Sequence, residues 1–321
     1  IGRIRPARHN PPMTSRLPRF HFRLLGPRHW PAWIGLGLLW LLAQLPYPLL
    51  MRVGAGLGWL IARLPGSRRR IAERNLQLCF PKLDSRQQAA LLEQSLRDVG
   101  LMLVEFALAW MGSRRAILRV PATIEGLEHL AAASARGQGV LLTGAHFSHL
   151  ELAGRLLVEH AGVELAGMYR EHGDAAFEWA IRRARSHYAA TMFTKNEVRG
   201  CVRYMQAGGC IWYAPDQDMR GKDTVFVPFF GIDASTLTAT HHLARLSGAC
   251  VIPFFHRRLD GSGYALRLEA PLADFPGQDV STDTARINAM IERMAREAPS
   301  QYLWIHRRFK SRPPGQASLY E

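Results

Sequence analysis

Residues 140–160 read VLLTGAHFSHLELAGRLLVEH and contain the change of pattern that decides the fold. Val140–Thr143 is a short apolar run with the length of a buried strand, whereas Leu150–His160 has apolar residues at helical spacing. The segment between them, Gly144–His149, contains two histidines. A strand that passes through a short loop into a helix predicts one step of a strand–helix–strand fold.

The same alternation continues toward the C-terminus. Further strands are expected at Glu164–Met168, Cys210–Ala214, Val251–Phe255 and Tyr264–Leu268. Further helices are expected at Ala175–His187, Val198–Gln206, Leu237–Ser247 and Thr282–Ala298. This alternation predicts an α/β fold with a mostly parallel sheet flanked by helices. In such sheets the loops after the strands carry the chemistry, so Gly144–His149 lies in a favoured place.

The charge of the chain predicts an anionic partner. Lysine and arginine number 41 against 26 acids, which gives a formal charge of +15, and twelve arginines precede the first acid, Glu73. The partner can be a nucleic acid, a membrane surface or a charged substrate. No zinc-ligand spacing, RNA-binding signature or recognition-helix pattern accompanies the charge, so we do not expect a nucleic acid.

An uncharged, largely apolar stretch, WPAWIGLGLLWLLAQLPYPLLM, occupies residues 30–51. About 20 apolar residues span a bilayer core of about 30 Å, and tryptophan and tyrosine suit its interfaces. Pro46 and Pro48 favour the alternative, a buried helix that is broken before its end. We expect a membrane anchor, with the choice between a full span and insertion into one leaflet left open.

Three regions follow from these patterns. Residues 1–29 form a basic N-terminal segment, 30–64 the anchor, and 65–321 the folded catalytic domain. Within the last region, Ser85–Trp110 has an apolar helical stripe, and Ser85 is the expected N-cap.

His146 and Glu151 are the candidate catalytic residues of the loop. Five positions apart, they could not share one face of a helix, but at a strand-to-helix junction their side chains can converge. A carboxylate that bonds one ring nitrogen leaves the other nitrogen as a base. The alternative is structural: Ser148 and Glu151 also match a capping box, with Glu151 serving only the helix start.

Seven segments of the chain carry a resemblance to a known family. The His-x4-Glu spacing of GAHFSHLELAG resembles the motif of lipid acyltransferases. The late acyltransferases of lipid A biosynthesis, which add lauroyl or myristoyl groups, are similar to this chain in MYR (168–170), YAPDQD (213–218), VFVPFFG (225–231), QYLWIHRRFKSRPPG (301–315) and the N-terminal blocks AWIGLGLLWLLAQLPYPLL and NLQLCFP. The resemblance extends from about Pro18 to Tyr320.

The resemblance implies an activity and a location. Members of this family transfer an acyl group from acyl carrier protein to the hydroxyl of a 3-hydroxyacyl chain on a lipid A precursor. It implies that His146 takes the proton of this hydroxyl while Glu151 orients the ring. It also implies an enzyme of the cell inner membrane, in contact with its phospholipid, with its catalytic domain on the cytoplasmic side. Neither the chain length nor the acceptor position follows from the residues.

The same resemblance implies residues that bind the substrate or the oxyanion. They are Arg170, Arg183, Arg185, Asp216, Asp218, Arg308 and Lys310. Arginine forks suit phosphates, but the same cations can also form a solvated face or attract anionic lipid in general. His187 and Ala189 stand where relatives often have Arg and Asn, so acceptor preference stays open.

We expect no metal and no cofactor. The four cysteines are scattered without a C-x-x-C pair and are expected to be reduced, and Asp216 and Asp218 have no third ligand nearby. Two other functions remain as alternatives. One is an acyltransferase for another anionic glycolipid or for glycerol phosphate, and the other is a non-catalytic basic protein that binds lipid membranes.

Overall fold

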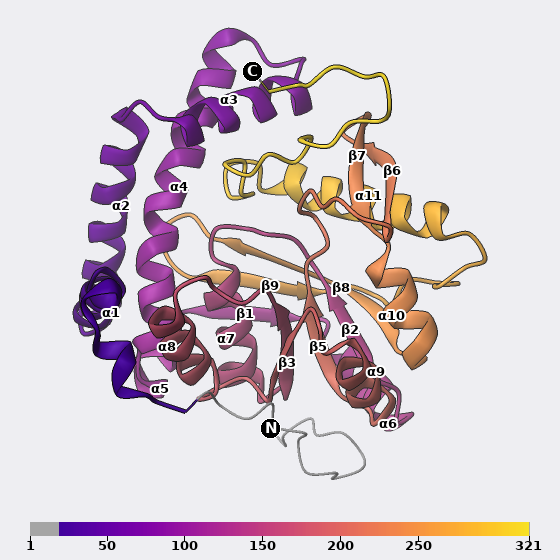
Figure 1. Ribbon diagram of the computed structural model, residues 1–321, viewed down its shortest axis with the longest axis horizontal. Helices are drawn as coiled ribbons and strands as arrows, with labels where there is room; N and C mark the ends of the chain where they lie inside the picture. The colour runs from indigo at the N-terminus through magenta and orange to yellow at the C-terminus, as the bar shows by residue number, and fades with distance from the viewer. Residues whose placement is uncertain (1–18, 321) are drawn as a thin grey trace.

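The computed structural model describes residues 19–320, so most of the predicted basic segment 1–29 lies outside them. Its centre is a seven-stranded sheet (Figure 1). In spatial order the strands are β1 (Ala122–Glu125), β9 (Tyr264–Leu268), β8 (Cys250–Arg258), β2 (Val140–Thr143), β5 (Cys210–Tyr213), β3 (Leu165–Tyr169) and β4 (Met192–Thr194). All neighbours are parallel except β8 and β9. The predicted mostly parallel α/β sheet is confirmed.

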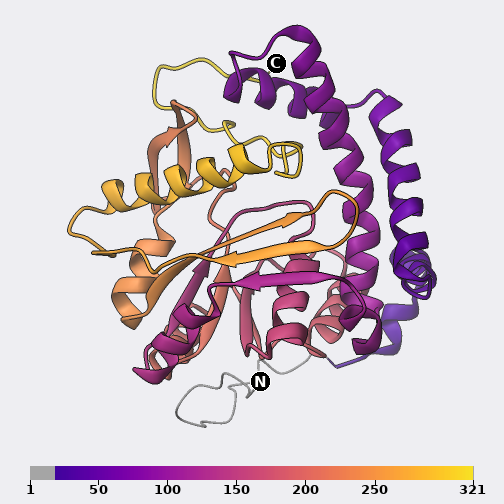
Figure 2. The same cartoon turned by 180° about the vertical axis from the view of Figure 1, so that it is seen from behind.

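Helices flank the sheet and bury both of its faces (Figures 1 and 2). They are α5 (Arg114–Leu118), α6 (Leu127–Ala135), α7 (Leu150–Ala161), α8 (Ala175–Arg185), α9 (Val198–Gln206), α10 (Ala239–Ser247) and α11 (Val280–Glu297). Leu141 and Leu142 are consecutive in β2 but belong to different hydrophobic clusters. Because successive side chains of a strand point to opposite faces, the sheet separates two cores.

A two-stranded hairpin stands apart from the main sheet. Its strands β6 (Thr224–Phe229) and β7 (Ile232–Leu237) are antiparallel, and β6 packs on α11. The hairpin was not predicted, although it contains the VFVPFFG block.

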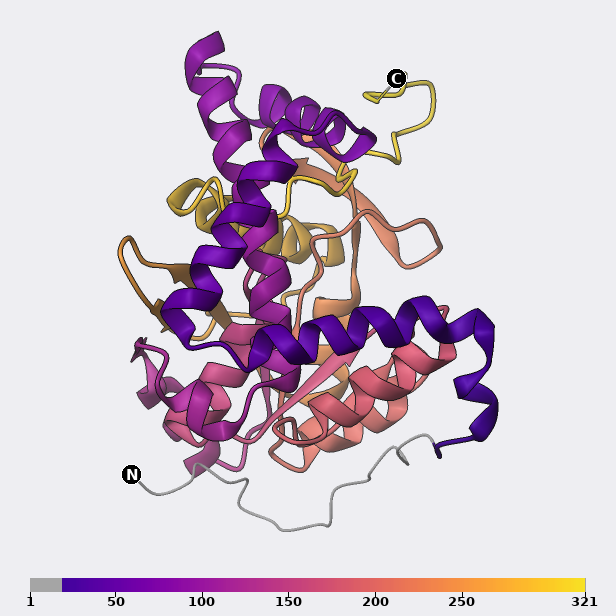
Figure 3. The same cartoon turned by 90° about the vertical axis from the view of Figure 1, so that its left-hand side faces the viewer.

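The apolar N-terminal stretch forms two helices rather than one. α1 (Trp30–Ala43) ends before Pro46, and α2 (Tyr47–Arg63) starts after it, as the two prolines indicated. Figure 3 shows α1 lying across the molecule and α2 running beside α4 (Ser85–Met111). Within residues 19–320, no helix combines the length and apolar character needed to cross a membrane. A membrane-spanning form of the predicted anchor is therefore not supported.

Glycines let α2 and α4 touch through their backbones. A Cβ on Gly100 would lie 2.1 Å from the Gly58 nitrogen, and one on Gly54 would lie 2.6 Å from Val104. Such distances leave no room for any side chain, so the two helices pack at the closest possible approach.

The N-terminus of α4 differs from the prediction by one residue. The N-cap is Asp84, not Ser85: its Oδ1 accepts from the Gln87 nitrogen at 2.8 Å. The Gln87 side chain accepts in turn from the Asp84 nitrogen at 3.0 Å. These reciprocal bonds form a capping box that satisfies two backbone donors. The helix before α4 is α3 (Ser67–Cys79).

Candidate active site

His146 and Asp216 meet at the carboxyl edge of the sheet. β2 and β5 are parallel neighbours in which Thr143 pairs with Tyr213. His146 and Asp216 each lie three residues beyond this pair, so strand register brings them together. His146 Nδ1 lies 2.6 Å from Asp216 Oδ1, and the His146 backbone nitrogen donates to Oδ2 at 3.0 Å.

Burial and charge set the protonation of this pair. Burial lowers the pKa of His146, but the charge and hydrogen bond of Asp216, with a contribution from Glu151, outweigh it and raise the pKa. Burial raises the pKa of Asp216, but His146 more than offsets this and lowers it to about 2. An ionised carboxylate only accepts, so Nδ1 carries the proton and Nε2 keeps its lone pair. The His146 side chain is 24% exposed.

Glu151 does not hold the His146 ring, which corrects the predicted contact. Its carboxylate is ion-paired with Arg185 and accepts from Trp110 Nε1 at 2.7 Å and from the Tyr188 hydroxyl at 3.1 Å. Both oxygens are therefore occupied. Burial raises the pKa of Glu151, but Arg185 outweighs burial and the pKa is lowered.

The capping-box interpretation of Glu151 is also wrong. α7 begins after His149, whose side chain makes no cap bond, and the Ser148 hydroxyl accepts from Arg258 instead. Glu151 serves a buried ion pair and not the helix start.

A cavity of about 380 Å³ lies beside His146 and Glu151. Most of its remaining wall is apolar, with Phe106, Leu150, Leu165, Met168 and Met192 among the lining residues. A pocket that combines an apolar wall with a few converging polar groups is typical of a small-ligand site.

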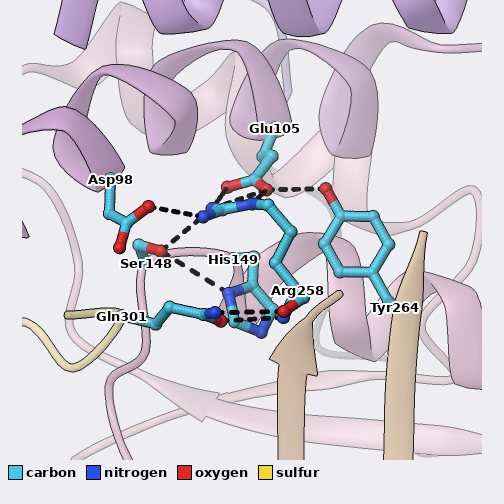
Figure 4. A network of polar contacts seen from close by, with 7 residues as sticks. All are labelled: Asp98, Glu105, Ser148, His149, Arg258, Tyr264 and Gln301. Carbon is cyan, nitrogen blue, oxygen red and sulfur yellow. Dashed lines mark hydrogen bonds and ion pairs between the residues drawn. The ribbon is translucent and has the colours of Figure 1, made fainter. Parts of the chain in front are cut away.

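Arg258, at the end of β8, fixes the loop that carries His146 (Figure 4). Its guanidinium donates to both oxygens of Glu105 at 2.9 Å, to Asp98 at 2.7 Å and to the Ser148 hydroxyl at 3.1 Å. Glu105 also accepts from the Tyr264 hydroxyl at 2.6 Å. The two acids belong to α4, so Arg258 ties this helix to the catalytic loop.

The C-terminal segment holds the loop from the other side. The Ser148 nitrogen donates to the Gln301 carbonyl at 2.8 Å, and the Leu303 nitrogen donates to the His146 carbonyl at 2.9 Å. The Gln301 side-chain oxygen accepts from the Arg258 backbone nitrogen, and its side-chain nitrogen donates to the Arg258 carbonyl. The loop thus has the support that a preorganised catalytic group needs.

The structure separates the predicted arginines. Arg170 is exposed and lines the cavity of His146, and Arg185 lines it while bound to Glu151. Arg183 is exposed and lines a different groove. Of the three, Arg170 remains available to a substrate at the catalytic cavity.

The other predicted residues are placed outside this cavity. Arg308 is only 2% exposed and donates to the Ser235 carbonyl and the Thr236 hydroxyl, which argues against its predicted contact with a substrate. Asp218 accepts from the backbone and hydroxyl of Ser311. Lys310 is exposed and does not line the cavity.

No metal centre is formed by the part of the chain that the structure describes: residues 19–320 contain no cluster of three or more His, Cys, Asp or Glu suited to a metal ion. The four cysteines are free thiols.

A family model for bacterial lipid A biosynthesis acyltransferases matches residues 17–311. The chain belongs to this family. The lipid A biosynthesis lauroyltransferase of Escherichia coli (strain K12) is 39% identical over 95% of this chain and 100% of its own length. The palmitoleoyltransferase of the same organism is 38% identical over 94% of this chain and 98% of its own.

Other members of the family agree. A lipid A biosynthesis acyltransferase of Haemophilus influenzae is 36% identical over 96% of this chain and 99% of its own length. Among solved structures, a 1-acyl-sn-glycerophosphate acyltransferase from Thermotoga maritima has a TM-score of 0.35 and 13% identity, covering 73% of this chain and 99% of that one. Membership of the lipid A acyltransferase family rests on sequence alone.

Proposed function

We propose that this lipid A acyltransferase moves a fatty acyl group from acyl carrier protein to the hydroxyl of a 3-hydroxyacyl chain on a lipid A precursor, with His146 as general base. The observation that carries the proposal is the His146–Asp216 pair at the mouth of an apolar cavity. Family membership supports the lipid A precursor as the acceptor.

The proton has a defined route. Asp216 keeps the proton of the ring on Nδ1, so Nε2 accepts the proton of the acceptor hydroxyl as its oxygen attacks the thioester carbonyl. The imidazolium that forms is stabilised by the Asp216 charge. The tetrahedral intermediate then collapses, the carbon–sulfur bond breaks, and the thiolate takes the proton from His146. An ester and a free carrier thiol result.

The oxyanion of that intermediate needs a positive or hydrogen-bonding neighbour. Arg170 supports this role because it lines the cavity and makes no ion pair within residues 19–320. Arg185 is already neutralised by Glu151, so we assign Arg185 to holding the cavity wall. A single donor of this kind contributes about 3 kcal/mol to transition-state stabilisation.

We propose that residues 30–64 associate with the inner membrane, with catalytic residues 65–321 on its cytoplasmic side. Large apolar side chains of α1 are more than half exposed, which is unusual for a surface that faces only water. They are Trp30, Ile34, Leu38, Trp40 and Leu41. Arginines precede and follow this helix and would face anionic phospholipid.

Reconstitution tests the activity directly. Purified protein is incubated with acyl carrier protein loaded with acyl chains of several lengths and with a lipid A precursor, and the product is identified by mass spectrometry. We expect one added acyl group with the wild type and none with His146→Ala. Acylation of glycerol phosphate in place of the precursor would contradict the proposal, as would full turnover by His146→Ala.

A further inference from the structure

A groove of about 1080 Å³ adjoins the catalytic cavity and has no part in the mechanism above. It lies among α1, the end of α4, α7 and α8, and Figure 3 shows α1 crossing beside α8. Its apolar walls include Trp33, Leu36, Met111 and Trp179. The volume is nearly three times that of the catalytic cavity and lies at the upper end of the range for ligand sites.

Trp110, Val158 and Tyr188 line both spaces. Trp110 and Tyr188 each donate a hydrogen bond to Glu151, and Trp110 stacks on Phe106 with ring centroids 4.9 Å apart. The groove and the cavity of His146 therefore share part of a wall, in which Glu151 holds two of the three side chains.

The charges around the groove are largely paired with one another. Arg114 bonds Glu159 at 2.9 Å, and Arg155 donates to the carbonyls of Leu108 and Ala109. Arg183 is exposed, and among residues 19–320 its guanidinium has only the Trp179 ring beneath it, 6.0 Å from the ring centroid. The remaining carboxylate of the lining, Glu164, would repel an anion, so an anionic headgroup would bind at Arg183.

We propose that this groove holds the primary acyl chain of the lipid A precursor, while the smaller cavity holds the donated chain; this rests on the proposed function. The hydroxyl of the primary chain must meet the thioester carbonyl at His146, which lines the cavity and not the groove, so the groove would hold the part of the primary chain beyond this hydroxyl. The donor presents one uncharged chain, which suits the smaller, mostly apolar cavity. The acceptor is an anionic lipid with several chains, which suits the larger groove with Arg183 at its edge.

Two glycines of α1 allow a matched test. A Cβ at Gly37 or at Gly35 would have no atom within 4 Å, so a side chain can be added at either position without a clash at its first carbon. Gly37 lines the groove and Gly35 does not. We expect Gly37→Phe to raise KM for the lipid A precursor at least tenfold and to leave KM for the acyl carrier protein thioester within twofold. Gly35→Phe should change neither by more than twofold.

Unchanged acceptor KM in Gly37→Phe, or a rise in the donor KM instead, would overturn the assignment. A second measurement needs no turnover. A lipid A precursor with a diazirine at the end of its primary chain is irradiated with the His146→Ala protein, and labelled residues are mapped by mass spectrometry. Labels at Trp33, Met111 or Trp179 support the groove, whereas labels only around Met168 and Met192, or none, refute it. Groove labelling with an inactive wild type would overturn the proposed function and leave the groove assignment standing.

Discussion

The Nδ1 atom of His146 lies 2.6 Å from Oδ1 of Asp216, although 70 residues separate them in the chain. The contact follows from strand register, because Thr143 and Tyr213 are paired and both loops reach their functional residue at the third position. A histidine with one nitrogen held in this way is ready to act as a base through the other.

Asp216→Asn should reduce kcat by about a hundredfold to ten-thousandfold, the range for loss of an effective general base. The amide cannot hold Nδ1–H as an anion does, so the ring loses its tautomer and its positive charge is no longer stabilised. Steady-state kinetics at saturating substrates measure the effect. Asp218→Asn is the control from the same loop, and it should lose far less activity because Asp218 bonds Ser311 instead. Equal losses would contradict the assignment.

The activity should depend on pH through His146. Its pKa is raised above the ordinary value of 6.5, because Asp216 outweighs the effect of burial, so kcat/KM should rise with pH through a pKa above 6.5. In Asp216→Asn only Glu151 still opposes the lowering of the pKa by burial, so the same limb should move to lower pH. A limb that stays in place in this variant would show that another group titrates.

The contribution of His146 to folding stability should change with pH in the opposite direction to kcat/KM: it falls as pH rises. The raised pKa means that protonated His146 stabilises the fold, fully below pH 6.5 and progressively less as pH rises through the folded-state pKa. Ionised Asp216, whose pKa is lowered, stabilises the fold fully above pH 3.8, and this contribution is lost as pH falls toward about 2. Denaturant unfolding of the wild type and Asp216→Asn across this range measures both contributions.

Glu151→Gln should lose stability as well as activity. It leaves Arg185, whose side chain is 10% exposed, without its counter-charge, which costs about 3 kcal/mol. The double variant Glu151→Gln/Arg185→Gln should recover part of this loss, and free energies of unfolding in urea measure the cycle. Strictly additive losses would show that the two side chains do not depend on each other.

Ser148→Ala should separate the position of the loop from the stability of the core. It removes one bond to Arg258, which costs about 1 kcal/mol, and lets the His146 loop move, so kcat should fall at unchanged KM. Arg258→Met leaves Asp98 and Glu105 buried without a cation and should cost about 3–5 kcal/mol. Arg267→Met removes a more exposed ion pair and should cost less than about 1 kcal/mol. The idea fails if Ser148→Ala turns over at the wild-type rate.

Gly100→Ala should destabilise the packing of α2 on α4. The added Cβ would lie 2.1 Å from the Gly58 backbone, which cannot give way, so we expect a loss of about 1–3 kcal/mol and a lower Tm. Gly56→Ala adds the same atom to α2 with nothing within 4 Å and should be neutral or slightly stabilising. Similar melting temperatures for the two variants would argue against the close contact.

Much of the sheet could be predicted because its strands are short apolar runs between helical patterns. The predicted bounds are exact for two strands, Val140–Thr143 and Tyr264–Leu268, and for one helix, Val198–Gln206. Strands with a weaker pattern were missed: β1 has every second residue exposed, and β4 has only three residues. Such segments are defined by their neighbours in the sheet and not by their own composition.

The site was predicted only in part. His146 could be named because one segment carries the loop, but its partner comes from a different strand. Asp216 was predicted to bind substrate and not to pair with His146. The pairing depends on β2 and β5 being neighbours in the sheet, and strand order cannot be read from one sequence. The equal spacing of His146 and Asp216 beyond their strands becomes a signal once that order is known. Arg308 was also predicted to bind substrate. That prediction was wrong because the sequence does not show that this cation near the C-terminus is buried in the core.

The glycine contact between α2 and α4 has a practical consequence for preparing the enzyme. Removing the chain up to residue 64 to obtain a shorter protein would uncover the face of α4 on which Gly58 packs against Gly100. The bared face belongs to the same helix that supplies Asp98 and Glu105 to Arg258. Shortened versions should therefore purify as aggregated or inactive material, and protein that keeps both N-terminal helices is the form to crystallise or assay.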